Sequence, residues 1–342
     1  MRVTACVVSW NSARELPTAL DSLLAQQVPG LEVVVVDNAS ADTSRDVVGR
    51  YPDVRLVANP TNRGFAGAAN QGAALAARHG NEALLVCNPD ILLEPDYIQR
   101  AVEALAAGPR RAAVAGRLWR LPDGDRTRAG RLPRMIDTTG HVAFRTRLFR
   151  NRGEGERDVG QFDLPGEVFG VSGAAALYRL DALDDVAVGG EIFDEDLFAF
   201  WEDVDLDWRL KLRGWQTWYA PDARGWHERG GAGPRRTAVV ERLNFANRVL
   251  VIIKNDDARS LARALPGFAA TSVLKAGELA LTVPSAFVTS FGRARLVGPM
   301  LAKRRAIRAR CTVDPAAVVD EWFGPFDYSR WVRTWWHRVR RT

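Results

Sequence analysis

Cysteine is scarce in this sequence of 342 residues, and its three cysteines are far apart. They are Cys6, Cys87 and Cys311, and no two of them form a CxxC pair. A disulfide framework or a structural zinc site needs closely grouped cysteines, so neither is expected. This cysteine usage fits a reducing compartment best.

Long hydrophobic runs are also absent. The longest uncharged stretch in the C-terminal third, Leu279–Gly292, has 14 residues and contains Pro284. A membrane-spanning helix needs about 20 apolar residues. The first residues lack the small-residue cleavage site of a signal peptide. We therefore expect neither a transmembrane helix nor a cleavable signal.

Acidic residues are few near the C-terminus. From Arg293 onward there are 12 Lys and Arg against 4 Asp and Glu, a balance of +8, whereas residues 1–292 have a balance of −2. Such a basic region, mixed with apolar runs, suits an acidic partner surface such as anionic lipid or nucleic acid. The alternative is an ordinary helical cap with a solvated basic face.

Apolar residues make up 47% of the chain and charged residues 26%, which are ordinary values for a globular protein and exclude wholesale disorder. The N-terminal third alternates apolar runs with segments of helical spacing. Strand–helix alternation predicts an α/β fold with a doubly wound, mostly parallel sheet and helices on both faces. The predicted strands are Val3–Ser9, Leu31–Val36, Val54–Ala58, Ala83–Cys87 and Ala112–Gly116, and the predicted helices are Ala13–Gln27, Ser40–Tyr51, Gly67–His79 and Pro95–Ala107.

Residues 121–165 break this pattern, because they are rich in glycine, arginine and aspartate. We predict a surface insertion there with one short hairpin. Beyond it we predict strands at Val168–Tyr178 and Gln216–Ala220, and helices at Asp203–Leu212, 238–255 and within 256–310. The expected organisation is a domain over 1–250, with halves at about 1–120 and 165–250, and a basic amphipathic helical region over 251–342.

Polar side chains follow three of the predicted strands. They lie in Ser9–Asn11, Asp37–Ser40 and Asn88–Asp90. Ligands bind doubly wound sheets at the carboxyl ends of their strands, so these residues predict a site. The alternative is that they are good turn and N-cap residues. Asp90, which follows a proline, suits Mg²⁺ or Mn²⁺ whose remaining ligands are phosphate oxygens.

A second polar cluster combines acids with aromatic rings. Acids at 202, 203, 205 and 207 follow Phe198, Phe200 and Trp201. Acids at a helix N-terminus interact favourably with the helix dipole, which would explain them alone. Aromatic walls, however, raise the pKa of a carboxylate by desolvation, which suits a general base. His227 precedes a glycine-rich stretch at 230–233 that could form a mobile lid, although a lone histidine is usually structural or exposed.

Together these motifs resemble a known family. Over residues 1–250 the chain resembles the family 2 inverting glycosyltransferases with the GT-A fold, and most closely their bacterial rhamnosyltransferase-type branch. The resemblance rests on the order and spacing of Val7–Asn11, Val35–Ser40, Asn62–Ala66, Asn88–Asp90, Val171–Ala174, Glu202–Leu206 and His227. At the position of the family's DxD motif, this sequence has Asn88 in place of the first aspartate.

The resemblance implies roles for individual residues. Asp203 would be the base that deprotonates the acceptor, with Glu202 beside it. Asp90 and His227 would bind the divalent cation, Mn²⁺ or Mg²⁺. Trp201 and Gly173 would contact the acceptor. Asp37 would bind the nucleotide base, and the donor would further contact Ser9, Asn11, Asn38, Arg63, Gly64 and Asn88.

The implied activity is direct, inverting transfer of a sugar from a nucleotide sugar to a hydroxyl of a glycan or a polyprenyl-diphosphate-linked saccharide. The preferred donor is dTDP-L-rhamnose, with a galactofuranosyl or other hexosyl donor as the alternative. The expected location is cytoplasmic, peripheral on the inner face of the cell membrane, with an anionic membrane surface and no nucleic acid as partner. The oligomeric state is left open.

Two other classes of protein compete with this interpretation. A nucleotidyltransferase usually has a glycine-rich N-terminal loop with a basic residue, whereas the first turn here is Ser9–Ser12. A non-enzymatic protein that binds membrane surfaces or nucleic acid would use the basic tail alone. The presence of Asp90, Asp203 and His227 argues against it.

Overall fold

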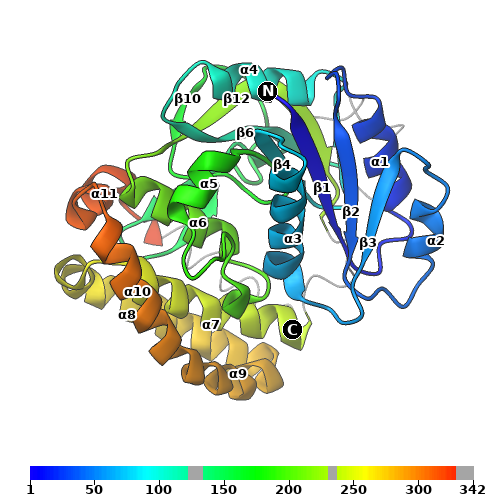
Figure 1. The fold of residues 1–342 in the computed structure, drawn as a ribbon. Coiled ribbons are helices and arrows are strands. Elements are labelled where there is room, and N and C mark those ends of the chain that lie inside the picture. The colour runs from blue at the N-terminus through cyan, green and yellow to red at the C-terminus, as the bar shows by residue number, and fades with distance from the viewer. Residues whose placement is uncertain (122–133, 230–236, 329–342) are drawn as a thin grey trace.

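The computed structural model describes residues 1–121, 134–229 and 237–328, and a ten-stranded β-sheet with helices on both faces lies at its centre (Figure 1). The glycine-rich stretch at 230–233 lies outside these residues. The described part is a mixed α/β fold with helices at its C-terminal end, which confirms the predicted fold class.

Four parallel strands form the N-terminal half of the sheet, in the order β3-β2-β1-β4. The register pairs Ser9 with Asp37, so the two residues are neighbours at the carboxyl edge. The strands are β1 (Val3–Ser9), β2 (Glu32–Asp37), β3 (Val54–Ala58) and β4 (Ala83–Cys87), and the helices between them are α1 (Leu16–Leu24), α2 (Ser44–Val48) and α3 (Gly64–Arg78).

Helix α2 is shorter than the predicted Ser40–Tyr51. The hydroxyl and the backbone N–H of Ser44 both donate to Oδ1 of Asp42, at 2.5 and 3.0 Å. Such local side-chain bonds offer the backbone an alternative to a helix. The chain therefore forms a turn over 38–43 and begins the helix only at Ser44.

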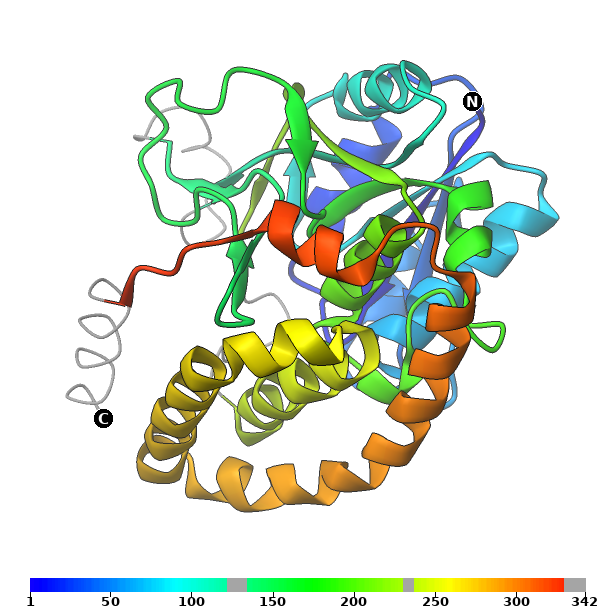
Figure 2. The same cartoon turned by 90° about the vertical axis from the view of Figure 1, so that its left-hand side faces the viewer.

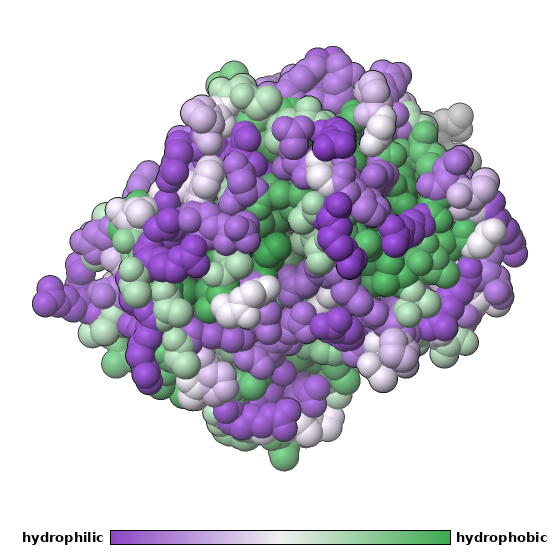
Figure 3. Space-filling model, viewed as in Figure 1, coloured by the Kyte–Doolittle hydropathy of each residue, from purple (hydrophilic) through white to green (hydrophobic). Residues whose placement is uncertain are grey.

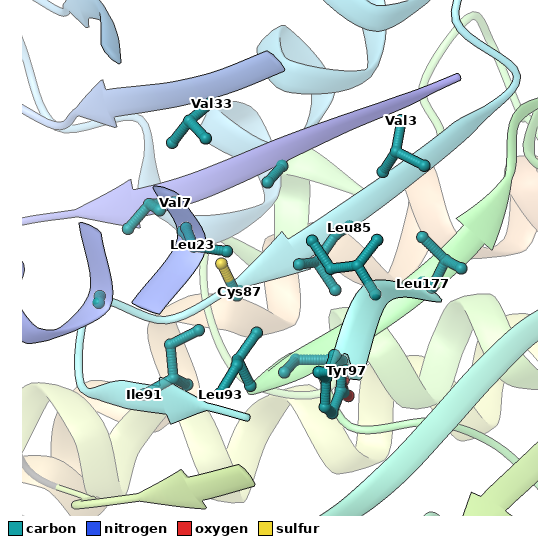
Figure 4. Packing of buried hydrophobic residues seen from close by; sticks show 14 of the residues in the cluster. Val3, Val7, Leu23, Val33, Leu85, Cys87, Ile91, Leu93, Tyr97 and Leu177 are labelled. Atoms are coloured by element: carbon teal, nitrogen blue, oxygen red, sulfur yellow. The ribbon is translucent and has the colours of Figure 1, made fainter. Parts of the chain in front are cut away.

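Alternate side chains of the strands pack into two separate cores. Val33 and Val35 pack with α1 and with α4 (Tyr97–Ala106), whereas Val34 and Val36 pack with α3. Successive residues of a strand point to opposite faces, so a strand that is covered on both sides is apolar throughout. Figure 4 shows part of the first core, where side chains from β1, β2, β4 and α1 meet.

The other half of the sheet is mixed. β11 (Ala175–Arg179) lies antiparallel between β4 and β6 (Arg111–Arg120), and β12 (Gln216–His227) pairs in parallel with β6. β12 therefore extends well beyond the predicted Gln216–Ala220. The shorter strands are β5 (Ile91–Leu93) and β10 (Gly166–Val168), which pair with β12, and β7 (Ile136–Thr138), which pairs with β6.

The prediction of one strand over Val168–Tyr178 is wrong. Between β10 and β11 the chain passes close to α6 (Glu202–Leu212), and a Cβ on Gly170 would lie 1.8 Å from Oδ2 of Asp207. The N–H groups of Val171 and Gly173 donate to carboxylates of α6, each at 3.1 Å. Backbone donors that a continuous strand would pair across the sheet are thus used by the helix.

The segment 121–165 contains the predicted hairpin, formed by β8 (His141–Phe144) and β9 (Phe149–Asn151). β13 (Phe323–Gly324) joins β8 in parallel. The prediction of a surface insertion is nevertheless wrong in part, because Asp137 and His141 are 0% and 5% exposed. β7 joins the central sheet beside β6 and carries Asp137 into the interior.

The C-terminal helices pack on α6 through a third core. It combines Val204 and Trp208 of α6 with residues of the later helices, including Leu250 and Met300. Figure 2 shows the helices that follow α7 (Ala238–Asn255) as an arc, whose last helix contacts α6. The remaining helices are α5 (Leu180–Val186), α7 (Ala238–Asn255), α8 (Ala258–Thr282), α9 (Pro284–Ser290), α10 (Val297–Arg310) and α11 (Pro315–Trp322), with short 3₁₀ helices at Glu195–Leu197 and Phe291–Leu296.

Helix α7 runs without interruption across residue 250, where the sequence suggests a boundary between two regions. The third core also joins both sides of that position. Among the described helices, none has the length and apolar character required to cross a membrane.

Candidate active site

The carboxyl edge of β1 and β2 contains two buried oxygens that have no partner among the described residues. They are Oγ of Ser9 and Oδ1 of Asp37. The other carboxylate oxygen of Asp37 accepts from Nε of Arg45 at 2.7 Å and from the N–H of Ser40 at 3.1 Å. A buried carboxylate oxygen without a donor is costly, so this edge presents an acceptor that a donor group of a ligand could satisfy.

Asn38 and Asn11 connect the loops around this edge. Nδ2 of Asn38 donates to the carbonyl of Gly64 at 2.9 Å, and its Oδ1 accepts from Asn59 at 3.0 Å. Oδ1 of Asn11 accepts from the N–H of Ala41 at 2.8 Å. Both side chains thus orient the loops, and Asn38 is almost completely buried.

Gly64 joins the two halves of the site. It has φ +72°, and a Cβ there would lie 2.2 Å from the carbonyl oxygen of Phe198. That carbonyl accepts from the N–H of Ala66 at 3.1 Å. Next to it, the half-exposed Arg63 forms an ion pair with Glu195 at 2.9 Å. A glycine is required because the backbone of the acid-rich segment passes so close.

Asp90 and His227 meet because β5 pairs with β12. The register places His227 opposite Ile91, the residue after Asp90. Nε2 of His227 lies 3.1 Å from Oδ1 of Asp90 and 3.2 Å from Nδ2 of Asn88. The structure thus brings together the three side chains for which the resemblance implies a place around the cation and the diphosphate.

Asp137 holds the other nitrogen of His227. Its Oδ2 lies 2.9 Å from Nδ1, and Arg229 forms an ion pair with the same carboxylate. Burial alone would lower the pKa of His227, but Asp90 and Asp137 raise it to about 9. Burial likewise opposes ionisation of Asp137, whose pKa is nevertheless lowered by His227 and Arg229. A carboxylate behind a histidine is the usual support of a metal ligand.

The pair formed by Asp90 and His227 fits a small divalent cation. Two ligands at about 2.1 Å from a cation and at right angles to each other lie about 3 Å apart, as these two atoms do. No group of three or more His, Cys, Asp or Glu side chains suited to a metal occurs in the described ranges. A cation held here would therefore need further ligands from its substrate.

Asp203 lies next to this pair through the backbone of Gly173 and Ala174. The N–H of Gly173 donates to Oδ2 of Asp203 at 3.1 Å. The carbonyl of Ala174 accepts from the N–H of Asn88 at 3.0 Å. One dipeptide thus connects the first residue of the Asn88–Asp90 motif with the carboxylate at the start of α6.

Glu202 is the buried neighbour of Asp203. Its Oε2 has no partner within the described part of the chain. Burial, followed by the charges of Asp203 and Asp205, raises its pKa well above the ordinary value. A Cβ on Gly173 would lie 3.2 Å from the ring of Phe65, so a larger residue at 173 would require that ring to shift. The role of Gly173 in this geometry is to bring an N–H to Asp203.

The aromatic residues before α6 have an unusual backbone. Phe198, Phe200 and Trp201 have φ of 68°, 67° and 76°. Such conformations are strained for residues with a Cβ and cluster at functional sites. The fully buried Asn247 of α7 stabilises this segment, because its Nδ2 donates to the carbonyls of residues 197, 199 and 200 at 2.8–3.0 Å.

Sequence reasoning missed three residues of this site, namely Asp137, His141 and Asn247, and it assigned no role to Asp207. The first two lie in the segment that was predicted to be a surface insertion. A signal was available for His141, since the chain has only four histidines. No local signal marks Asn247, whose contacts come from a segment nearly 50 residues earlier.

The fold resembles that of solved glycosyltransferases with the GT-A fold. A mannosyltransferase from Pyrobaculum calidifontis, solved with GDP-Man and Mn²⁺, superimposes with a TM-score of 0.51 at 22% identity. The match covers 94% of this chain and 87% of the mannosyltransferase chain. TarS 1–349 of S. aureus, solved with UDP-GlcNAc, gives a TM-score of 0.54 at 15% identity and covers 91% and 88%. At these identities the likeness concerns the fold alone.

The sequence comparisons define the family. The model of glycosyl transferase family 2 matches residues 4–187. N-acetylglucosaminyl-diphospho-decaprenol L-rhamnosyltransferase of Mycobacterium tuberculosis is 32% identical over 252 residues, which are 68% of this chain and 77% of that protein. Succinoglycan biosynthesis protein ExoO of Rhizobium meliloti is 40% identical over 114 residues, about a third of each chain. The chain belongs to glycosyl transferase family 2, in its rhamnosyltransferase-like branch, and is a glycosyltransferase, which confirms the resemblance.

Proposed function

We propose that the protein transfers L-rhamnose from dTDP-L-rhamnose to a hydroxyl of a polyprenyl-diphosphate-linked saccharide, with inversion at the anomeric carbon. The sugar and the acceptor class rest on the relative from Mycobacterium tuberculosis. The observation that carries the chemistry is the dipeptide Gly173–Ala174, which joins Asp203 to the Asn88–Asp90 motif.

The donor binds at the carboxyl edge of the parallel strands. Asp37 accepts a hydrogen bond from an N–H of the nucleotide base through its unpartnered Oδ1. Ser9 offers its buried hydroxyl beside it. The donor pocket is completed by Asn11, Asn38, Arg63, Gly64 and Asn88.

Asp90 and His227 would hold a divalent cation, Mn²⁺ or Mg²⁺, beside the donor diphosphate. Two of the structural neighbours were solved with Mn²⁺, and the spacing of the two side chains suits such an ion. When bound, the cation offsets the charge that develops on the departing nucleoside diphosphate. Asp137 fixes the ring of His227 so that Nε2 faces the cation.

Asp203 is the general base. It takes the proton of the acceptor hydroxyl as that oxygen attacks the anomeric carbon on the face opposite to the leaving group. A single displacement inverts the configuration and needs no covalent intermediate. Glu202, Trp201 and Gly173 form the acceptor side, where an aromatic ring offers a face for a sugar.

The C-terminal helices bind the surface of an anionic membrane, which presents a lipid-linked acceptor and makes the protein peripheral on the cytoplasmic face. Apolar side chains are exposed along α8–α10, and Figure 3 shows apolar residues at the lower edge of the molecule, where α8 and α9 lie. Between residues 258 and 313 the sequence has ten basic residues and one acid, Glu278, which is buried. This composition suits anionic headgroups.

The test is product formation from a panel of nucleotide sugars with a polyprenyl-diphosphate-sugar acceptor and Mn²⁺ or Mg²⁺. We expect turnover of dTDP-L-rhamnose, its loss in excess EDTA, and at least a 100-fold lower kcat in Asp203→Asn with unchanged thermal unfolding. Asp222→Asn, at an exposed position of β12, is the matched control.

Turnover of another hexosyl donor alone would replace rhamnose and leave the mechanism intact. Normal turnover in excess EDTA would show that the reaction does not need the cation. Transfer by a folded Asp203→Asn variant at the wild-type rate would remove Asp203 as the base.

A further inference from the structure

His141 lies directly behind the carboxylate of Asp203. It is the first residue of β8 and is 5% exposed, and its backbone N–H donates to the carbonyl of Gly170 at 2.8 Å. Its Nδ1 lies 2.8 Å from Oδ2 of Asp207, and its Nε2 lies 3.7 Å from Oδ2 of Asp203. The imidazole ring is thus placed between two carboxylates that are one helical turn apart.

Asp207 has no freedom to move away from the histidine. It is fully buried, and both of its oxygens accept from the N–H of Val171 at 3.1 Å. Gly170 packs so closely that a Cβ there would lie 1.8 Å from Oδ2. An acceptor fixed in this way keeps a proton on Nδ1 of His141, so Nε2 is the nitrogen that faces Asp203.

The charges around the ring favour its cationic form. Burial lowers the pKa of His141, but Asp203 and Asp207 raise it above the ordinary value. Burial raises the pKa of Asp207 to about 6, against the effect of His141. The other polar groups that face these residues are Asn151 on β9, Tyr178 on β11, and Glu202 and Lys211 on α6.

We propose that His141, oriented by Asp207, is a positioning residue that keeps the Asp203 carboxylate ionised and correctly directed for proton abstraction. This inference rests on the proposed function, in which Asp203 is the base. Oδ2 of Asp203 also accepts a hydrogen bond from the N–H of Gly173 at 3.1 Å. A cationic imidazole ring of His141, with Nε2 3.7 Å from the same oxygen, favours the ionised form of this carboxylate.

Loss of the positive charge at His141 has a defined effect on the pH dependence of kcat. An opposite charge within about 4–6 Å favours the ionised form of a carboxylate by about one to three pH units. Removing it therefore moves the acidic limb of the kcat profile to higher pH, by about one unit. Below that limb, one unit corresponds to a tenfold lower kcat. The KM for the nucleotide sugar stays within twofold, because Gly170, Asp203 and Asp207, which His141 contacts, are not among the residues proposed to bind the donor.

The experiment measures kcat and KM between pH 5 and pH 9 for the full chain and four variants. His141→Gln removes the cation and keeps a polar side chain of similar length. Asp207→Asn keeps an acceptor for Val171 but removes the charge that stabilises the imidazolium. His79→Gln is the matched control, because His79 is a partly exposed histidine at the end of α3 that pairs with Glu32. Asp203→Asn reports on the base itself.

We expect the acidic limb to move upward in both His141→Gln and Asp207→Asn, and to stay in place in His79→Gln. If His141→Gln does not fold, Asp207→Asn carries the test. A uniform loss of kcat at every pH, or a wild-type profile in the folded variants, would overturn the role of His141 while Asp203 remains the base. Full activity of Asp203→Asn would instead refute the proposed function.

Discussion

Asp137 illustrates how a residue without a place in any motif can complete a site. It is fully buried, and its carboxylate is shared between Nδ1 of His227 and the guanidinium of Arg229. The histidine is thereby held with Nε2 toward Asp90 at 3.1 Å. Loss of such a support typically weakens metal binding or activity by about 10–100-fold.

We therefore predict that Asp137→Asn raises the Mn²⁺ concentration needed for half-maximal activity by about tenfold or more. The reason is that an asparagine lacks the negative charge that supports the ring of His227 and pairs with Arg229. Activity titrated with Mn²⁺ measures this, and Asp222→Asn serves again as the exposed control. Equal Mn²⁺ dependence of the variant and the wild type would show that Asp137 only stabilises the fold.

At the scale of single residues, the sequence predicted as site residues the ones that belong to family motifs. Asp90 and His227 lie 3.1 Å apart, and Asp203 is connected to Asn88 through Gly173 and Ala174, while the roles that the resemblance implies for them stay predictions. Asp137 and His141 could not be placed, because their burial follows from the pairing of β7 with β6 and the contact of β8 with residue 170. In each pairing one partner lies in the segment 121–165, whose own composition suggests a surface loop.

At the scale of elements, the conformation of the segment 197–201 depends on α7, a helix much later in the chain. Three of its backbone carbonyls accept from the single amide of Asn247 on α7. Three of its residues have positive φ, which costs of order 1 kcal/mol or more at each. The segment leads directly into Glu202 and Asp203, so its conformation directs both carboxylates.

We predict that Asn247→Ala lowers the free energy of unfolding by about 2–3 kcal/mol, because it leaves buried carbonyls without a donor. Relaxation of the segment also raises the KM for the acceptor more than that for the nucleotide sugar. Denaturant unfolding and acceptor titration measure the two effects. Asn244→Ala, one turn earlier on α7 with a single bond to its own helix, is expected to cost less than about 1 kcal/mol. Equal effects of both substitutions would contradict this role of Asn247.

For whole elements, prediction succeeded where the signal is local. The apolar run at 31–36 predicted a strand covered on both faces, and Val33–Val36 indeed pack alternately into two cores. The position of β11 between β4 and β6 could not be predicted, because it depends on long-range pairing. The split of the predicted strand Val168–Tyr178 depends equally on carboxylates of α6.

Over the whole molecule, buried ion pairs tie the C-terminal helices to the candidate site. Lys254 of α7 bonds Asp194 and Asp205 at 2.7 and 2.8 Å, and all three side chains are almost fully buried. Lys303 of α10 reaches Asp194 as well. Removing one partner of a buried pair leaves an uncompensated charge, so these helices cannot be deleted without disturbing the segment before α6.

This coupling decides how membrane binding has to be tested. A deletion from residue 293 would remove α10, which contributes Met300 and Ile307 to the third core. Charge reversal at exposed positions avoids that problem. Arg295 and Arg305 are both exposed on the C-terminal helices, whereas Arg50 and Arg100 are exposed near α2 and α4, on other sides of the molecule (Figure 1).

We predict that the double variant Arg295→Glu/Arg305→Glu binds anionic vesicles at least 30-fold more weakly than the wild type. Each basic residue near an anionic surface contributes about 1 kcal/mol, and the new acids are repelled. Sedimentation with phosphatidylcholine–phosphatidylglycerol vesicles measures the binding, which should also weaken as salt screens the charges. Arg50→Glu/Arg100→Glu has the same change in net charge and should bind as the wild type does. If both double variants lose binding equally, net charge alone attracts the protein, and if neither does, these helices do not form the membrane-binding surface.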